Sequence, residues 1–182
     1  MIFANGDEYE GEYVNGQEEG KGTLKFANGD IYAGEYRNGK RHGYGIYTHQ
    51  NGDKYEGYYE ADMKNGQGTA TFASGNKYVG EWKRNQRNGK GVLFFSNGDK
   101  YEGNFVDGME EDTNAVLYYS HGEVYKGGFS HGKRSGYGEY THESGDKYIG
   151  EYKNDARHGK GKLVCSDGEV TEGIWNDGIL QD

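Results

Sequence analysis

The sequence predicts an all-β protein, an elongated, single-layer antiparallel β-meander built from tandem hairpin repeats of 23 residues. Three observations favour this fold. A pattern of tyrosine, glycine and a second aromatic residue recurs at a fixed spacing, two turn-forming pairs punctuate each copy, and no stretch has sustained helical periodicity. The 34 glycines are also spread too densely for helices.

The repeats are defined by tyrosines that lie 23 residues apart, with a single spacing of 24. Seven repeats begin at Tyr9, Tyr32, Tyr55, Tyr78, Tyr101, Tyr125 and Tyr148. A partial repeat covers residues 1–8 and another covers residues 171–182. Because a fixed period of this size is typical of repeat arrays, we expect one continuous array over residues 1–182.

Each repeat contains two turns and therefore two short strands. The first turn is a pair such as Asn15-Gly16, and the second is a pair such as Asn28-Gly29. Tight hairpin turns require positive φ, which glycine, asparagine and aspartate tolerate. Where the first turn lacks glycine, another such residue takes its place: Asp62, Asn85 or Asp155.

Side chains alternate between the two faces of a strand, so Tyr9, Gly11 and Tyr13 share one face. The middle position of this trio is glycine in every repeat, and we expect aromatic rings to lie over these glycines, which stabilises strands. The third position is always aromatic. We predict that these aromatic residues line a groove that binds partners: Tyr13, Tyr36, Tyr59, Trp82, Phe105, Phe129, Tyr152 and Trp175.

The pattern resembles the MORN repeat (membrane occupation and recognition nexus). The segments "YAGEYRNGKRHGYG" from Tyr32 and "YIGEYKNDARHGKG" from Tyr148 are close to Y-x-G-x-(Y/W)-x-N-G-x-x-x-G-x-G, and the resemblance covers nearly the whole chain. It implies a meander rolled into a half-pipe with aromatic residues on one face. It also implies a protein scaffold in a cytoskeletal or ciliary assembly, such as an axonemal radial spoke, or alternatively a peripheral membrane adaptor that binds phosphoinositide headgroups.

Composition and charge narrow the classes of function. The formal net charge of −9 disfavours nucleic acid as a partner, and no apolar run reaches membrane-spanning length. The first residues do not resemble a signal peptide, and the single cysteine cannot form an intrachain disulfide. We therefore expect a cytoplasmic protein, which the resemblance would associate with the cytoskeleton or the axoneme of a cilium.

Basic residues gather after the first turn of the repeats, where one basic rim could serve the membrane alternative: Lys40, Arg41, Lys64, Arg87, Lys90, Lys133, Arg134, Arg157 and Lys160. A solvated edge is the simpler interpretation. Acidic residues after the second turn would offset membrane attraction: Asp30, Asp53, Asp99 and Asp146. This balance favours the scaffold, with membrane contact weak or absent.

The residues capable of chemistry recur in phase with the repeat, as scaffold positions do. His42 and His158 fill one repeat position, and His49 and His142 fill another. Cys165 takes a place that phenylalanine fills elsewhere and is best explained as an apolar filler. The recurring glutamates are expected to be solvated: Glu12, Glu35, Glu81 and Glu151. We predict no enzyme activity, no catalytic residue, no cofactor and no metal.

The fifth repeat is irregular. Its segment "GMEEDTNAVLYYSHGEVY" lacks the usual Gly-x-Gly and has one extra residue, which predicts a bulged, protruding loop that changes curvature or contacts a partner. The loop carries Glu110, Glu111 and Asp112. A cation site is one interpretation, but consecutive carboxylates rarely converge, so a solvated tip is favoured.

The expected partners are other proteins. An extended peptide or an amphipathic helix could occupy the aromatic groove. The outermost strands of the predicted sheet lack a neighbour, which favours assembly through the sheet ends, either with another MORN-repeat chain or as a homo-oligomer.

Overall fold

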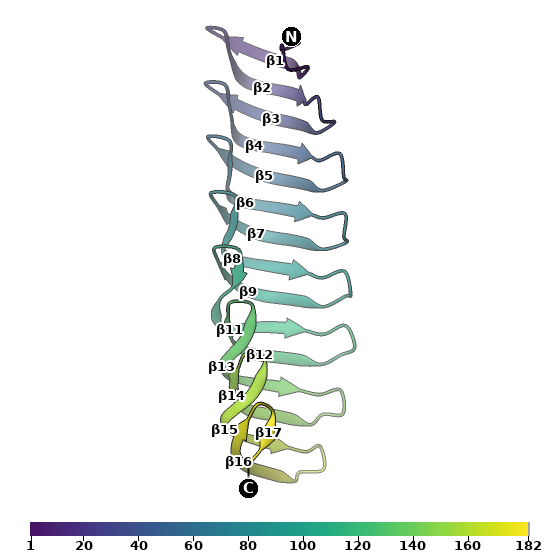
Figure 1. Cartoon of the computed structure of the whole chain (residues 1–182), viewed down its shortest axis with the longest axis vertical. Helices are drawn as coiled ribbons and strands as arrows, with labels where there is room; N and C mark the ends of the chain where they lie inside the picture. Colours follow the sequence, from purple (N-terminus) through teal and green to yellow (C-terminus); the bar gives the residue numbers. More distant parts are fainter. Residues whose placement is uncertain (182) are drawn as a thin grey trace. The chain divides into compact units, whose positions relative to one another are not determined.

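The computed structural model describes residues 1–181, and its regular secondary structure is entirely β-strand over that range. The chain forms two compact units, unit 1 over residues 1–88 and unit 2 from residue 89 onwards. Each unit is an antiparallel meander of hairpins, so the predicted all-β fold of hairpin repeats is confirmed (Figure 1).

Unit 1 is built from strands that each pair antiparallel with the next strand in the chain. Its complete strands are β1 (Glu8–Val14), β2 (Gln17–Lys25), β3 (Ile31–Arg37), β4 (Lys40–Thr48), β5 (Lys54–Glu60), β6 (Met63–Thr71) and β7 (Lys77–Lys83). In Figure 1 the two-residue turns of this unit lie on one side and the longer loops on the other.

Unit 2 follows the same plan, except that one strand is interrupted. From Gly89 onwards, β8 (Gln86–Phe94) pairs with β9 (Lys100–Val106). The interrupted strand is β10 (Met109–Glu110) followed by β11 (Asp112–Tyr118). The remaining strands are β12 (Val124–Ser130), β13 (Lys133–Thr141), β14 (Lys147–Lys153), β15 (Ala156–Val164), β16 (Val170–Asn176) and β17 (Ile179–Leu180).

The two kinds of turn differ in backbone conformation. In the first kind both central residues have positive φ, as in Asn15 (52°) and Gly16 (79°). The pair Asn154 (49°) and Asp155 (71°) adopts the same conformation without glycine, as predicted. In the second kind, Gly29 N–H donates to the Phe26 carbonyl at 2.9 Å, and Phe26 N–H donates to the Asp30 carbonyl at 2.9 Å.

A bulge in the second strand explains the Gly-x-Gly motif in the five hairpins that begin with β1, β3, β5, β12 and β14. Gly11 pairs with Gly22, but Tyr13 pairs with Glu18, so the second strand carries extra residues between these pairs. Gly20 lies in this bulge with a φ of 66°, a conformation that favours glycine. The first glycine of the motif therefore forms the bulge, and the second pairs with the glycine of the preceding strand.

Candidate functional site

Aromatic rings pack edge to face on one face of each unit. In unit 1 the centroid of Tyr32 lies 5.3 Å from that of Tyr36 and 5.3 Å from that of Tyr59, with the rings close to perpendicular. In unit 2, Tyr125 packs in the same way against Phe129 (5.4 Å) and Tyr152 (5.1 Å). T-shaped contacts at these distances are favourable, so the rings form the core of each unit.

The first tyrosine of each motif covers the glycine pair. A β-carbon added to Gly34 or Gly45 would overlap the ring or hydroxyl of Tyr32. The Tyr32 hydroxyl donates a hydrogen bond to the Glu35 carbonyl at 3.0 Å, which holds the ring in place. The prediction that rings lie over strand glycines is therefore confirmed.

The sequence-predicted groove residues lie on this face, and most of them are buried. Tyr13 is half-buried, whereas the other seven are no more than 7% exposed: Tyr36, Tyr59, Trp82, Phe105, Phe129, Tyr152 and Trp175. They are packed core residues and not open anchors, because each ring contacts neighbouring tyrosines. Their role in partner binding stays a prediction.

A row of half-buried cations lies over these rings. The Arg41 guanidinium carbon is 5.7 Å from the Tyr32 centroid and 5.3 Å from that of Tyr59. The Lys64 ammonium lies 4.6 Å from Tyr55 and 5.0 Å from Trp82. Arg134 and Arg157 occupy the same repeat position in unit 2 and also lie over two rings of the core. Such cation–π contacts add stability while covering the rings.

Several of the predicted basic residues have partners within their own unit. Arg41 also pairs with the Asp62 carboxylate at 3.1 Å, and Arg134 pairs with Asp155 at 3.4 Å. Of the nine predicted basic residues, the exposed ones are Lys40, Lys90, Lys133 and Lys160. Lys90 and Lys160 lie within second strands of their hairpins, whereas Lys40 and Lys133 directly follow tight turns, and a basic rim that binds phosphoinositides stays a prediction.

Beside the cations runs a less buried apolar row, here called the loop-side strip. In unit 1 the strip consists of Leu24, Phe26, Tyr47, His49 and Phe72, and in unit 2 of Phe95, Leu117, Tyr119, Tyr140, His142 and Leu163. Tyr47 contacts Phe26 with ring centroids 5.6 Å apart, and Tyr140 contacts Tyr119 at the same distance. A partner can reach these side chains more readily than the buried core rings.

Unit 1 contains a hollow of about 550 Å³ on the aromatic face, here called the first-repeat hollow. Its lining includes Tyr9, Glu18, Leu24, Phe26, Tyr36 and Arg41. The hollow joins the aromatic core to the loop-side strip, and its size suits a side chain with part of an extended peptide.

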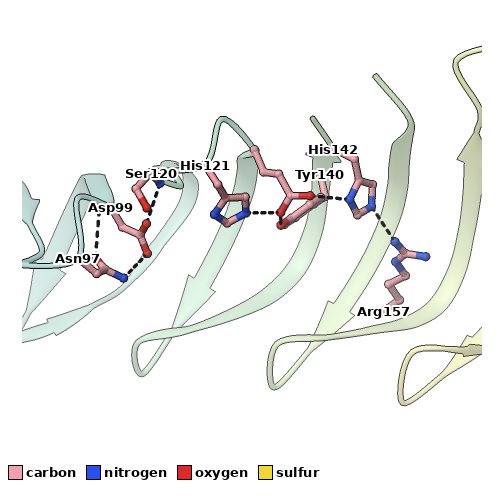
Figure 2. Close-up of polar contacts among 8 residues, drawn as sticks. Asn97, Asp99, Ser120, His121, Tyr140, His142 and Arg157 are labelled. Carbon is pink, nitrogen blue, oxygen red and sulfur yellow. Dashed lines mark hydrogen bonds and ion pairs between the residues drawn. The ribbon is translucent and has the colours of Figure 1, made fainter. Parts of the chain in front are cut away.

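Carboxylates after the second turn connect successive loops, which sequence reasoning did not anticipate. Asp53 accepts a hydrogen bond from the N–H of Ala73 at 2.8 Å, and Asp99 accepts one from Ser120 N–H at 2.8 Å (Figure 2). Each carboxylate thus holds a loop of the following repeat. Asp30, Asp53, Asp99 and Asp146 therefore have structural partners, and these hydrogen bonds lower the pKa of Asp53 and Asp146.

Glu123 takes the place of this aspartate in the fifth repeat and organises a larger network. Its carboxylate contacts the Tyr140 hydroxyl, His121 Nε2 at 2.8 Å and His142 Nδ1 at 2.9 Å, while His142 Nε2 lies 3.1 Å from Arg157 (Figure 2). Hydrogen bonds, first that from Tyr140, lower the pKa of Glu123 to about 2.

The three acids of the irregular repeat do not converge. Glu110 lies at the repeat position of the cations, Glu111 accepts the His131 N–H at 2.8 Å, and Asp112 accepts the Asn104 N–H at 2.7 Å. All three are half-buried, so they do not form the solvated tip that the sequence suggested. Backbone N–H groups hold the carboxylates of Glu111 and Asp112 within the sheet, and the role of the loop in curvature or partner contact stays a prediction.

The recurring glutamates and the cysteine lie where the fold explains them. The recurring glutamates are not merely solvated, because Glu12, Glu35 and Glu151 each accept a backbone N–H from the bulge of their hairpin, at 3.1–3.2 Å. Cys165 is half-buried, and burial raises the pKa of its thiol.

Residues 1–181 contain no group of His, Cys, Asp or Glu side chains placed to hold a metal ion. Within the same residues, no helix is long and apolar enough to cross a membrane.

Comparison with known structures supports the fold. The Sas-4 TCP domain of Drosophila melanogaster, solved with a proline-rich motif of Ana2, superposes with a TM-score of 0.54 at 10% identity and covers 93% of this chain and 90% of its own. The TCP10c domain of Drosophila melanogaster Sas-4 gives a TM-score of 0.51 at 12% identity, with 93% and 99% covered. At these identities the likeness concerns the fold alone.

Sequence comparison identifies the repeats themselves. No curated protein sequence matches the chain. A family model of the MORN repeat matches residues 9–31, 32–54, 55–77, 78–100, 101–111, 125–147 and 148–170. These matches begin at the seven tyrosines that start the predicted repeats, and the fifth match stops within the irregular segment. The chain therefore belongs to the MORN-repeat family.

Proposed function

We propose that this protein is a non-enzymatic scaffold that binds protein partners on its aromatic face, within a cytoskeletal assembly. The observation that carries this proposal is the loop-side strip, an apolar row that remains partly exposed beside a fully packed ring core. Apolar surface that stays accessible next to a hollow is typical of a binding site.

The chemistry of the strip favours an extended peptide as the ligand. Phe26 lines the first-repeat hollow, and Tyr47 of the next repeat packs against Phe26. Grooves lined by aromatic residues bind extended or proline-rich segments. The structurally similar Sas-4 domain binds a proline-rich motif of Ana2, which supports this class of partner. An amphipathic helix and a second MORN-repeat chain are further candidate partners.

The setting is inferred from the family. MORN repeats are common in cytoskeletal and ciliary proteins. The specific assembly that we propose is an axonemal radial spoke. The phosphoinositide alternative is less well supported, because Arg41 and Arg134 are paired with carboxylates and pack on aromatic rings. Assembly through the sheet ends stays a prediction that sedimentation at increasing protein concentration can check.

The experiment compares the two faces of unit 1. Phe26→Ala with Phe72→Ala alters the loop-side strip, and Tyr44→Ala with Tyr58→Ala removes two exposed rings from the opposite face as a matched control. We expect the Phe26→Ala, Phe72→Ala variant to lose affinity capture of cytoskeletal proteins from the source cell and the Tyr44→Ala, Tyr58→Ala variant to retain it. Circular dichroism checks that both variants are folded.

Two results would contradict the proposal. Equal capture by both pairs of variants would show that the aromatic face is not the binding surface. Sedimentation of the wild-type chain with phosphoinositide liposomes, together with no captured cytoskeletal protein, would favour the membrane alternative.

A further inference from the structure

The first repeat, like the irregular fifth repeat, lacks a basic residue that most of the other repeats share. In four repeats a basic side chain lies over two aromatic rings of the core: Arg41, Lys64, Arg134 and Arg157. The corresponding residue of the first repeat is Glu18, and the corresponding rings are Tyr9 and Tyr36. These two rings make the usual edge-to-face contact, with centroids 5.2 Å apart.

The first-repeat hollow lies at this position. Tyr9, Glu18 and Tyr36 all line it, and its volume of about 550 Å³ exceeds what one side chain occupies. The rings that carry a cation in other repeats thus border an open space here. An arginine or a lysine side chain occupies the corresponding position in four other repeats, so a basic side chain fits the hollow.

The charge around the hollow also suits a cation. Carboxylates of Asp7 and Glu18 border it, and the only basic residue among its lining is Arg41, which is already paired with Asp62 at 3.1 Å. Burial, and after it the Glu18 carboxylate, raise the pKa of Tyr9 to about 12, so the negative field of Glu18 reaches the ring. A cation over a ring beside a carboxylate gains from both interactions.

We propose that the first-repeat hollow binds an arginine or lysine side chain of a partner protein, held over Tyr9 and Tyr36 and beside Glu18. The basic residue belongs to an extended segment whose apolar neighbours lie along the loop-side strip. This inference rests on the proposed function, because it specifies that one of the side chains that the peptide site binds is positively charged.

The test uses the full chain and two matched peptides as probes. One peptide is acetyl-Gly-Ser-Arg-Ser-Gly-amide, and in the other citrulline replaces arginine, which keeps the shape of the side chain and removes its charge. Amide chemical shifts are followed by NMR during titration. We expect the arginine peptide to bind about tenfold more tightly than the citrulline peptide and to shift the amides of Tyr9, Glu18 and Tyr36.

Substitutions connect the binding to the hollow. Glu18→Arg supplies the cation found in the other repeats and is expected to abolish binding of the arginine peptide, while Glu18→Gln reduces the preference for arginine. Glu10→Arg makes the same change of charge at an exposed position of β1 and should leave binding unchanged.

The outcomes separate this inference from the proposed function. Equal binding of the two peptides, unchanged binding to the Glu18→Arg variant, or no saturable shift with either peptide would overturn the inference. Peptides that bind alike at the loop-side strip would leave the proposed function intact. Arginine-specific binding that Glu18→Arg abolishes, without capture of any cytoskeletal protein, would support the inference and contradict the assembly proposed above.

Discussion

The repeat that begins at Tyr32 and the repeat that begins at Tyr101 build the same ring cover from different residues. Tyr32 lies over the pair Gly34 and Gly45, whereas Tyr101 lies over Gly103 beside a fully buried Ala115. Both tyrosines donate a hydrogen bond to a carbonyl three residues later, at 3.0 and 3.1 Å. The ring and the small residues beneath it are thus the shared feature.

The bulges of the two repeats differ much more. In the regular repeat the Glu35 carboxylate accepts the N–H of Tyr44, and Arg41 lies over the rings. In the irregular repeat Asp112 accepts the N–H groups of Asn104 and Asn114, and Glu110 stands at the position of the cation. A repeat thus needs its packed rings, while different residues can satisfy the hydrogen bonds of the bulge.

The largest expected effect concerns the shared rings. Tyr32→Ala and Tyr101→Ala should each lower the free energy of unfolding by about 3–5 kcal/mol, because each removes a fully buried ring and leaves a cavity. Urea denaturation measures both changes, with the exposed Tyr44→Ala as the control, which should cost about 1 kcal/mol or less. A small loss at Tyr101 alone would show that the irregular repeat does not depend on its ring as the regular repeat does.

The next effect concerns the residue beneath the ring. Gly45→Ala should cost about 1–3 kcal/mol, because its methyl group would overlap the Tyr32 hydroxyl and force the ring aside. The irregular repeat already accommodates alanine at this place, so Ala115→Gly should cost only about 1 kcal/mol, mostly in backbone entropy. A larger cost at Ala115 than at Gly45, measured by thermal unfolding, would contradict the idea that the irregular repeat merely accommodates the alanine.

The loop carboxylates predict a difference in acid stability. The pKa of Glu123 falls to about 2 in the folded protein from 4.5, so its contribution is complete above pH 4.5 and is lost as the pH falls towards 2. Glu123→Gln should therefore lower the melting temperature near neutral pH and flatten its dependence between pH 4.5 and 2. Asp53→Asn provides the matched substitution in the regular repeat, and an unchanged pH profile in the Glu123 variant would refute the role of the network.

The smallest expected effect is a gain in stability. Glu110→Arg places a cation over Tyr101 and Phe129, as Arg41 lies over Tyr32 and Tyr59, and should stabilise the protein by about 0.5–1 kcal/mol. The Lys133→Arg variant, which alters an exposed residue without changing charge, serves as the control. A loss of stability would show that Glu110 is needed where it stands, and the two repeats would then differ in more than their bulges.

The sequence by itself determined the repeat period, the hairpins, the positive-φ turns and the presence of rings over glycines. Each of these features depends on residues within a single repeat, where the spacing along the chain and the alternation of a strand place side chains on a known face. Asn15-Gly16 can be identified as a tight turn because only two residues decide its conformation.

The tertiary structure decided which aromatic residues are buried, where the cations lie and what the carboxylates bind. Arg41 meets Asp62, and Asp53 meets Ala73, about one repeat further along the chain. Such contacts depend on the register between neighbouring hairpins, and on the bulge that shifts the pairing within each hairpin. A single repeat does not encode that register, because it arises only when successive hairpins pack their rings against one another.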